Sequence, residues 1–321
     1  MILKRIPRLA LTCPGQGILP QGCLHHLRKH RDLFDKSLQC IDEIMGSNFS
    51  KALLDVPHNR PDPWNLSTAN AQPAILGATY VLCEVFRKLH GIDLVAHPRT
   101  FFLLGHSLGE YSALVLGGAV PFEDGTRLVR KRGLLMEEFP QRSEMHVLVF
   151  RQAAFEKVID ITQREDVLAC INSETQVSIS GDPEKLKDVI STLNSSKKTI
   201  LKDVILPVHI PFHNKVLEPV EHELRKILAT SSNSLKSIVC NVDGVARTED
   251  VLRHTISATS RPVQWKKSMD FLGDNGCDVV LNLGPGNALD GMNGRFSIQN
   301  LALRNEEDML ALVAVLDSTS E

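Results

Sequence analysis

Three common signatures are missing from this sequence: paired cysteines, long apolar runs and an excess of one charge. The seven cysteines are widely spread and form no C-x-x-C pair, which favours free thiols in a reducing compartment over a disulfide framework or a zinc site. No apolar run approaches the roughly 18 residues that cross a bilayer. A formal net charge of −2 gives no reason to expect nucleic acid or a membrane surface as a partner.

The rest of the composition is that of an ordinary globular protein, with 43% hydrophobic and 23% charged residues. The 321 residues exceed one average domain, so we expect a large domain with a small one inserted or appended. The first ten residues, MILKRIPRLA, are basic and lack acids, like the end of a transit peptide. They run directly into a predicted strand at residues 8–13.

Predicted strands and helices alternate along both outer parts of the chain, which is the pattern of a parallel sheet covered on both faces. Between Met145 and Leu206 the predicted order is β-α-β-β-α-β, typical of a ferredoxin-like unit. We therefore expect an α/β fold. Its large α/β-hydrolase-like domain, with a parallel sheet, would comprise residues 1–142 and 209–321. Residues 143–208 would form an inserted small ferredoxin-like α+β domain.

The stretch Phe101–Gly118 carries the clearest chemical motif. A short apolar run leads into G-H-S-L-G at residues 105–109, and a helical pattern follows. Strand, G-x-S-x-G and helix in this order form the nucleophile elbow, whose glycines permit a tight turn. Ser107 would lie at the N-terminus of the helix, where developing negative charge is favoured. The alternative interpretation is a glycine-rich turn capped by a serine.

A serine nucleophile needs a general base within hydrogen-bond reach. Of the twelve histidines, His213 is the leading candidate, because it follows Pro211 and Phe212 where the small domain would rejoin the large one. His106 is next to the serine and should point away from it, so we expect it to shape the turn. No metal is expected: no residue set has zinc-like spacing, and Pro211 spoils a helical pairing of His209 with His213.

Two further features bear on the chemistry of this serine. An oxyanion hole needs two backbone N–H groups, and we expect them from Leu108, which follows the serine, and from the turn at residues 15–17, which holds Gln16. Arg132 precedes Gly133, and a glycine there permits close packing, which hints that this arginine has a specific target. The alternative is a solvated residue on a charged helix face.

Several short motifs occur along the chain in the same order as in one known family. They are PGQG at 14–17, AQPA at 71–74, GHSLGE at 105–110, Arg132-Gly133, Asn172-Ser173, PFH at 211–213, PVQW at 262–265 and GPG at 284–286. In this set and spacing the chain resembles the malonyl-CoA:acyl-carrier-protein transacylases, from about Leu9 to Leu316. The stretches IPFHN and GPGN look most similar to the mitochondrial members of fungi.

The resemblance implies a ping-pong acyl transfer for fatty-acid synthesis. Ser107, activated by His213, would take the malonyl group from CoA as an ester and pass it to the phosphopantetheine thiol of acyl carrier protein. Arg132 would bind the malonyl carboxylate with its planar guanidinium. The backbone N–H groups of Gln16 and Leu108 would form the oxyanion hole.

The resemblance also implies secondary roles. His106, Asn172 and Phe212 would contact the substrate, and Phe212 matches the malonyl-selective relatives where methylmalonyl-selective ones have serine. A backbone carbonyl near Asn282, instead of a carboxylate, would orient His213. We expect no cofactor, a monomer, a transient acyl carrier protein partner, and a mitochondrial or otherwise cytoplasmic location, without nucleic acid or membrane partners.

Two other functions fit part of the sequence. A serine thioesterase or hydrolase would have Ser, Asp and His in that chain order, and Asp182 lies between Ser107 and His213. However, Asp182 is placed to cap a helix, and a hydrolase has no need of Arg132. The third candidate is a non-catalytic module that binds a carrier protein, against which the presence of both Ser107 and His213 argues.

Overall fold

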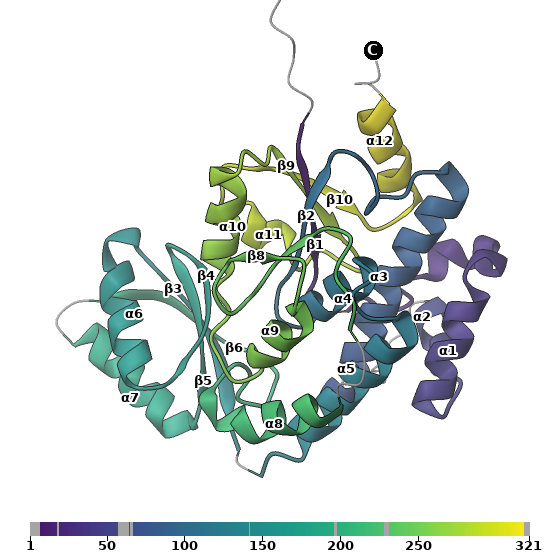
Figure 1. Cartoon of the computed structure of the whole chain (residues 1–321). Helices are drawn as coiled ribbons and strands as arrows, with labels where there is room; N and C mark the ends of the chain where they lie inside the picture. The colour runs from purple at the N-terminus through teal and green to yellow at the C-terminus, as the bar shows by residue number, and fades with distance from the viewer. Residues whose placement is uncertain are drawn as a thin grey trace, which may run out of the picture.

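Short apolar segments from distant parts of the chain form the larger of two sheets. Its strands are β1 Leu9–Cys13, β2 Thr100–Gly105, β7 Ser237–Val239, β8 Ala246–Arg247, β9 Val279–Leu283 and β10 Gln299–Leu303. They lie in the order β10-β9-β1-β2-β7-β8, parallel except for β7 with β8 (Figure 1). The central strands β1 and β9 are buried at every residue, as in a sheet covered on both faces.

The structure is a computed structural model that describes residues 7–17, 19–56, 64, 67–140, 142–195, 198–227 and 231–317. Residues 1–6, which hold most of the basic N-terminal stretch, lie outside the described residues.

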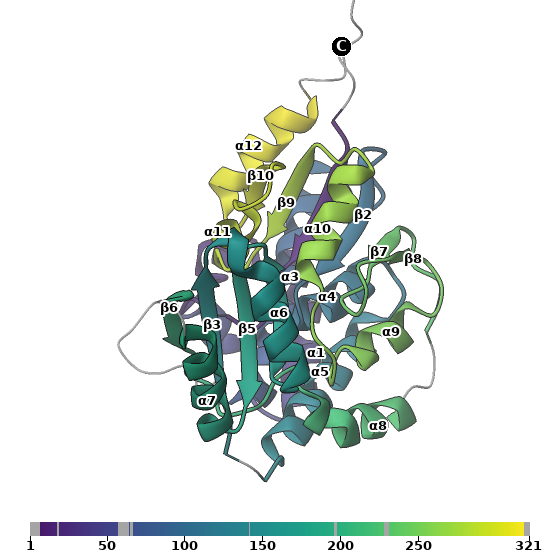
Figure 2. The same cartoon turned by 90° about the vertical axis from the view of Figure 1, so that its left-hand side faces the viewer.

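A second, antiparallel sheet has its own hydrophobic core. Its strands are β3 Glu144–Phe150, β4 Leu168–Ser173, β5 Gln176–Gly181 and β6 Ile200–Ile205, in the order β4-β5-β3-β6. Helices α6 Phe155–Arg164 and α7 Pro183–Asn194 cover the face that points away from the larger sheet (Figure 2). Leu148, Val158 and Leu186 join strand and helices in this core. The predicted β-α-β-β-α-β unit beside a parallel sheet is confirmed, whereas the domain boundaries stay a prediction.

Helices cover both faces of the larger sheet. Phe102 of β2 contacts Phe271 edge to face, with ring centroids 5.3 Å apart, while Leu103, on the opposite face, approaches Gly117. The helices outside the second sheet are η1 His25–Leu33, α1 Asp35–Met45, α2 Ser50–Leu54, α3 Thr68–His90, α4 Leu108–Leu116, α5 Phe122–Glu137, α8 Glu218–Ile227, α9 Val251–Ser257, α10 Trp265–Asp274, α11 Asp290–Asn293 and α12 Glu306–Asp317, with one further short turn, η4 Lys215–Leu217. In the part of the chain that the structure describes, no helix combines the length and apolarity that a bilayer crossing requires.

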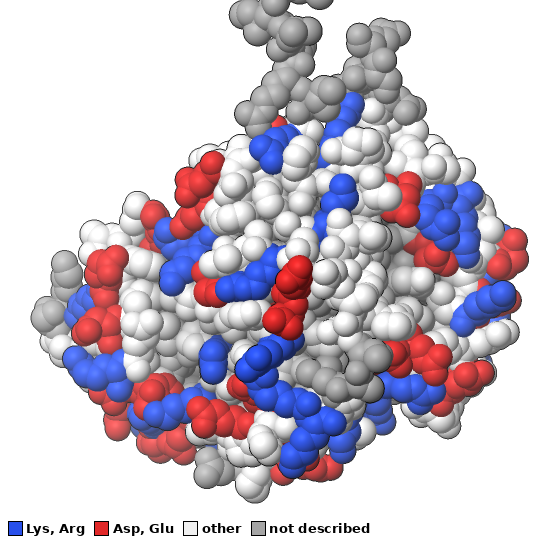
Figure 3. Space-filling model, in the orientation of Figure 1, with Lys and Arg blue, Asp and Glu red and all other residues white. Residues whose placement is uncertain are grey.

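Charged side chains of both signs are scattered over the face drawn in Figure 3, and Lys and Arg gather in a blue patch at its lower centre, in the region of α8 and α9. On α8, Arg225 and Lys226 pair with Glu221 and Glu223 at 2.8 and 2.6 Å.

The contact between α3 and α5 depends on a glycine. A Cβ on Gly133 of α5 would lie 2.3 Å from the Cα of Ala69 in α3, so no side chain fits there without separating the helices. The close approach buries the neighbouring Arg132 to 2% exposure. The packing of this pair therefore decides where Arg132 points.

We expect Gly133→Ala to lower the free energy of unfolding by about 1–3 kcal/mol, because overpacking forces the two helices apart. Gly273→Ala is the matched control, since a Cβ on that α10 residue meets nothing within 4 Å. It should raise stability by about 0.5–1 kcal/mol through helix propensity. Urea unfolding of both variants measures the difference, and equal values would contradict the packing argument.

Candidate active site

Ser107 lies in the turn between β2 and α4 with φ 55° and ψ −115°. A positive φ is costly for a residue with a Cβ, on the order of 1–3 kcal/mol, and persists only when neighbours enforce it. A Cβ on Gly105 would lie 1.9 Å from the carbonyl carbon of Gly109, and one on Gly109 would lie 2.1 Å from the carbonyl oxygen of Cys13. The glycines of G-x-S-x-G are thus required sterically, and the expected strand, turn and helix are present.

Asn241, two residues after β7, fixes this strained turn from both sides of the serine. Its Oδ1 accepts the Ser107 backbone N–H at 2.8 Å, and its Nδ2 donates to the Gly105 carbonyl at 2.6 Å. Its own backbone N–H donates to Oε2 of Glu110 at 3.1 Å, and the Thr255 hydroxyl donates to Oε1 of Glu110 at 2.9 Å. Glu110 is fully buried, and this burial raises its pKa from 4.5 to about 7.

Sequence reasoning missed the positions of Asn241 and Glu110 in this network. One signal existed: Glu110 is the only acid in the otherwise apolar helix LGEYSALVL. An acidic residue in a helix that is buried on all sides indicates internal hydrogen bonds, because a buried charge needs partners. The identity of those partners depends on the tertiary fold.

His213 contacts the serine as the sequence predicts. Its Nε2 lies 2.6 Å from Ser107 Oγ, and its Nδ1 lies 2.6 Å from the carbonyl oxygen of Ala258. A carbonyl only accepts, so Nδ1 carries the proton and Nε2 is left to accept from the serine hydroxyl. Burial, followed by the charge of Arg132, lowers the pKa of His213 to about 3. The ring is therefore neutral at physiological pH, as a general base must be.

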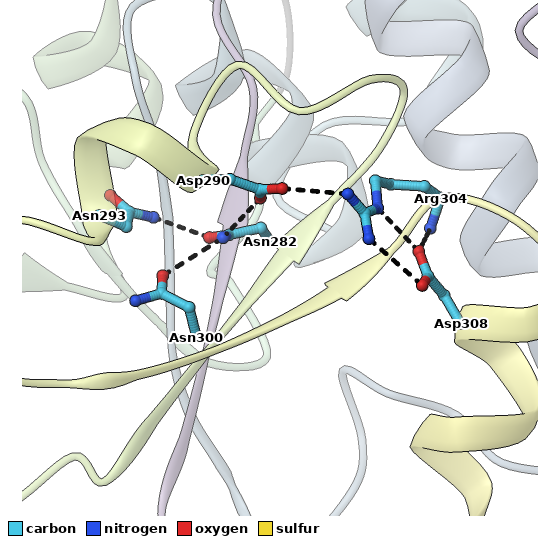
Figure 4. Close-up of polar contacts among 6 residues, drawn as sticks. All are labelled: Asn282, Asp290, Asn293, Asn300, Arg304 and Asp308. Atoms are coloured by element: carbon cyan, nitrogen blue, oxygen red, sulfur yellow. Dashed lines mark hydrogen bonds and ion pairs between the residues drawn. The ribbon is translucent and has the colours of Figure 1, made fainter.

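The carbonyl that orients His213 belongs to Ala258, so the expectation that it lies near Asn282 is wrong. Ala258 follows the last residue of α9, where helix carbonyls lack partners within the helix. Asn282 lies inside β9, and its side chain bonds to Asn293, Asp290 and Asn300 (Figure 4). A backbone carbonyl has no residue signature, so the sequence could not identify this group.

Arg132 is buried close to the serine and the histidine. It is 2% exposed; its Nη1 donates to Oε1 of Gln72 at 2.8 Å, and its Cζ lies 5.4 Å from the centroid of the Tyr111 ring. Within the described residues, its Nε has no hydrogen-bond partner. Burial lowers its pKa, although the guanidinium stays charged. A planar cation with an N–H group that lacks a partner can bind a carboxylate.

A chain of hydrogen bonds connects Arg132 to the turn after β1. Oε1 of Gln72 accepts from Arg132, and Nε2 of Gln72 donates to Thr68 Oγ1 at 3.2 Å. The Thr68 hydroxyl in turn donates to Oε1 of Gln16. Gln72 is fully buried on α3. In the sequence, Gln72 stands out only as part of AQPA, and a glutamine in an apolar helix is the available signal for this contact.

The predicted site residues meet at one cavity of about 200 Å³ between the two sheets. The cavity is lined by site residues from the larger part of the chain and by one residue of the second sheet, Asn172. Those from the larger part are Gln16, His106, Ser107, Leu108, Arg132, Phe212 and His213. His106 Nε2 lies 3.0 Å from Oδ1 of Asn172, and burial lowers the pKa of His106 to about 4. The described residues contain no group of three or more His, Cys, Asp or Glu side chains that could hold a metal ion.

A serine bonded to a neutral histidine, in a cavity that also contains a buried guanidinium, can form and transfer an ester on that serine. The class defined by this fold and site is that of α/β enzymes that transfer acyl groups through a serine. Comparison with known families agrees. Residues 11–285 match the acyl transferase domain, and the chain belongs to this family.

Similar proteins share one activity in their names. The malonyl CoA-acyl carrier protein transacylase of Bacillus subtilis strain 168 is 30% identical over 302 residues, which cover 89% of each chain. Another Bacillus subtilis protein of that name is 30% identical over 70% of this chain, and the match spans 56% of its length. The structure of the malonyl CoA-acyl carrier protein transacylase from Coxiella burnetii superposes with a TM-score of 0.85 at 25% identity, covering 97% of this chain and 98% of the other.

We expect Glu110→Gln to stabilise the protein selectively at high pH. Because the pKa is raised in the folded protein, Glu110 is protonated in both the folded and the unfolded protein below pH 4.5. Its contribution to the free energy of unfolding is lost as the pH rises through about 7. The introduced amide can keep both contacts, because the Thr255 hydroxyl can turn to the Val251 carbonyl at 3.0 Å.

The free energy of unfolding of Glu110→Gln relative to wild type should therefore rise by roughly 3 kcal/mol between pH 4 and pH 8, at about 1.4 kcal/mol per unit of pKa. Urea unfolding across this range measures it. A difference that does not change with pH would contradict a raised pKa of Glu110 in the folded protein.

Proposed function

We propose that this chain transfers a malonyl group from CoA to the phosphopantetheine thiol of acyl carrier protein, through an ester on Ser107. The observation that carries the proposal is the buried, unpaired guanidinium edge of Arg132 in the same cavity as the Ser107–His213 pair. A cation in that place suits an acyl group that ends in a carboxylate. The names of the similar proteins agree with this substrate.

In the first half-reaction, Ser107 Oγ attacks the thioester carbonyl carbon while its proton passes to Nε2 of His213. The carbonyl of Ala258 accepts from Nδ1 and stabilises the imidazolium that forms. Negative charge develops on the former carbonyl oxygen, where the N–H groups of Gln16 and Leu108 are proposed to donate. The carbon–sulfur bond then breaks, and the CoA sulfur takes the proton from His213.

The second half-reaction reverses these roles. The thiol of the carrier gives its proton to His213 and attacks the serine ester, the carbon–oxygen bond breaks, and Ser107 recovers the proton. Each half exchanges one thioester or ester for another, so the scheme balances without a cofactor. Phe212, His106 and Asn172 line the cavity and are proposed to contact the acyl group and its thioester.

The hydrolase alternative is not favoured. Asp182 accepts the Lys185 backbone N–H at 3.0 Å as the N-cap of α7, and a carbonyl occupies the position beside His213 that a triad acid would need. Acyl carrier protein as a transient partner and a monomeric state are part of the proposal. The mitochondrial location implied by the likeness to fungal members stays a prediction, since the relatives named above are bacterial.

With labelled malonyl-CoA and no carrier protein, we expect a covalent adduct on the wild-type chain. Ser107→Ala should abolish it, because the variant lacks the hydroxyl that His213 contacts. Ser195→Ala, an exposed serine of the second domain, is the control and should retain the label. Mass spectrometry of the intact protein measures the adduct, and a label that persists in Ser107→Ala would refute the mechanism.

Arg132→Ala should reduce malonyl transfer far more than acetyl transfer, because only the malonyl group carries a carboxylate. A charged hydrogen bond in a buried site contributes on the order of 2–4 kcal/mol, which corresponds to a loss of about 30- to 1,000-fold in kcat/KM. Lys131→Ala, its exposed neighbour, should leave both rates unchanged. Equal losses for the two acyl groups would argue against carboxylate binding.

A further inference from the structure

The loop of residues 284–293, here called the wall loop, forms one side of the active-site cavity. Ala288, Leu289 and Met292 of this loop line the cavity. The loop also packs on the turn that holds Gln16, since a Cβ on Gly17 would lie 3.2 Å from the Cβ of Ala288. A displacement of the loop would therefore change both the shape of the acyl cavity and the support of this turn.

Asn282 anchors the wall loop from behind. Its Oδ1 accepts from Nδ2 of Asn293 at 2.7 Å, and its Nδ2 donates to Oδ1 of Asp290 at 3.0 Å (Figure 4). Both partners lie in α11, the short helix within the loop. Two further hydrogen bonds use the remaining positions of this amide. The Thr12 hydroxyl donates to Oδ1 of Asn282 at 2.7 Å, and Nδ2 of Asn282 donates to Oδ1 of Asn300 at 3.3 Å. Asn282 is 4% exposed, so every hydrogen-bonding position of its side chain is used inside the protein.

The direction of these bonds is fixed by groups that can only donate or only accept. The Trp265 indole N–H, a donor only, bonds to Oδ1 of Asn293 at 3.0 Å. Nδ2 of Asn293 must then face Oδ1 of Asn282, which turns Nδ2 of Asn282 toward the carboxylate of Asp290, an acceptor only. The network has a single consistent arrangement, so exchanging one donor for an acceptor disturbs it.

A second contact holds Asp290 from the solvent side. Arg304 Nη1 donates to Oδ2 of Asp290 at 3.1 Å, and Nε of Arg304 pairs with Asp308 at 2.8 Å. On the other side, Trp265 is fully buried and meets the His106 ring edge to face, with centroids 5.4 Å apart. The anchor of the wall loop is therefore continuous with the residue beside Ser107.

We propose that Asn282 is a positioning residue that sets acyl selectivity by fixing the wall loop against the cavity. This inference rests on the proposed malonyl transfer. Asn282 touches no substrate and acts through Asp290 and Asn293. Its amide joins α11 to β9 through two hydrogen bonds, and loss of this link lets Ala288, Leu289 and Met292 move away from the acyl group.

The test exchanges donor and acceptor across one hydrogen bond. Asn282→Asp places a carboxylate opposite the carboxylate of Asp290, and Asp290→Asn leaves one oxygen to serve both Asn282 and Arg304. The double variant Asn282→Asp/Asp290→Asn restores a donor facing an acceptor between these two positions and leaves an oxygen for Arg304, while the weaker 3.3 Å contact with Asn300 stays lost. Asn48→Asp, an exposed asparagine, is the matched control for the change of charge.

The measurement is kcat/KM for malonyl-CoA and for methylmalonyl-CoA, with thermal unfolding of each variant. We expect Asn282→Asp to lower the malonyl-to-methylmalonyl ratio by roughly tenfold, the effect of one methyl group in a pocket that has loosened. The double variant should recover most of that ratio, and Asn48→Asp should keep the wild-type value. If Asn282→Asp does not fold, Asp290→Asn carries the test, with a smaller decrease of about threefold expected.

An unchanged ratio in a folded Asn282→Asp variant would overturn the proposal, and so would a ratio that the double variant does not recover. A loss of melting temperature with both substrates slowed equally would assign Asn282 a structural role only and would also overturn it. These outcomes are distinct from a failure of the proposed function, in which the wild-type protein itself would transfer no malonyl group.

Discussion

The burial of His213 beside the Arg132 guanidinium is the constraint on which the chemistry of this cavity depends. Both side chains are 2% exposed, and among the described residues no carboxylate pairs with Arg132. The uncompensated cation adds to burial in lowering the pKa of His213 to about 3, which keeps Nε2 able to accept the serine proton. In the proposed reaction a malonyl carboxylate supplies the missing negative charge. By the same electrostatics, we expect the pKa of His213 to rise when a carboxylate-bearing acyl group binds beside Arg132.

The position of the nucleophile depends on hydrogen bonds that offset backbone strain. Ser107 has a positive φ, and the side chain of Asn241 bonds to the Ser107 N–H and to the Gly105 carbonyl. Each such bond contributes on the order of 1 kcal/mol, comparable with the strain. Glu110 and Thr255 hold Asn241 in turn. The turn is thus supported by polar groups that are not among the residues lining the cavity.

How much of this site the sequence could predict depends on whether a group carries a chemical signature of its own. Ser107 is marked by its glycines, Arg132 by the glycine that follows it, and His213 by the junction in which it lies. The two sheets were predictable because strand and helix order is a local property of the chain.

The remaining groups become visible only in the fold. Ala258 acts through a backbone carbonyl at a helix end, which any residue could supply, and the expectation for Asn282 was wrong for that reason. Asn241 and Gln72 are ordinary polar residues in the sequence. Their roles depend on strands and helices that are distant in the sequence and meet in the fold. Asn241 and Ser107, for example, are separated by 134 residues.

The second sheet is more than an insertion beside the site, because it determines where the base lies. The chain returns from β6 through Phe212, His213 and Asn214. The Ser180 hydroxyl on β5 donates to the Phe212 carbonyl at 2.7 Å, and Nδ2 of Asn214 donates to the Ser180 carbonyl at 2.8 Å. His213 is therefore fixed on both sides by one residue of the second sheet, while its ring is fixed by Ala258 of the larger part.

The same sheet is joined to the larger part beside β4. The Ile171 N–H donates to the Val263 carbonyl at 2.8 Å, and the Val263 N–H donates to the Ala169 carbonyl at 2.9 Å. These bonds fix the distance between the sheets at the edge of the cavity. A shift of the second sheet would move the base relative to Ser107, which belongs to the larger sheet. The 2.6 Å contact between Ser107 and His213 therefore depends on the junction of the two sheets as well as on the two side chains.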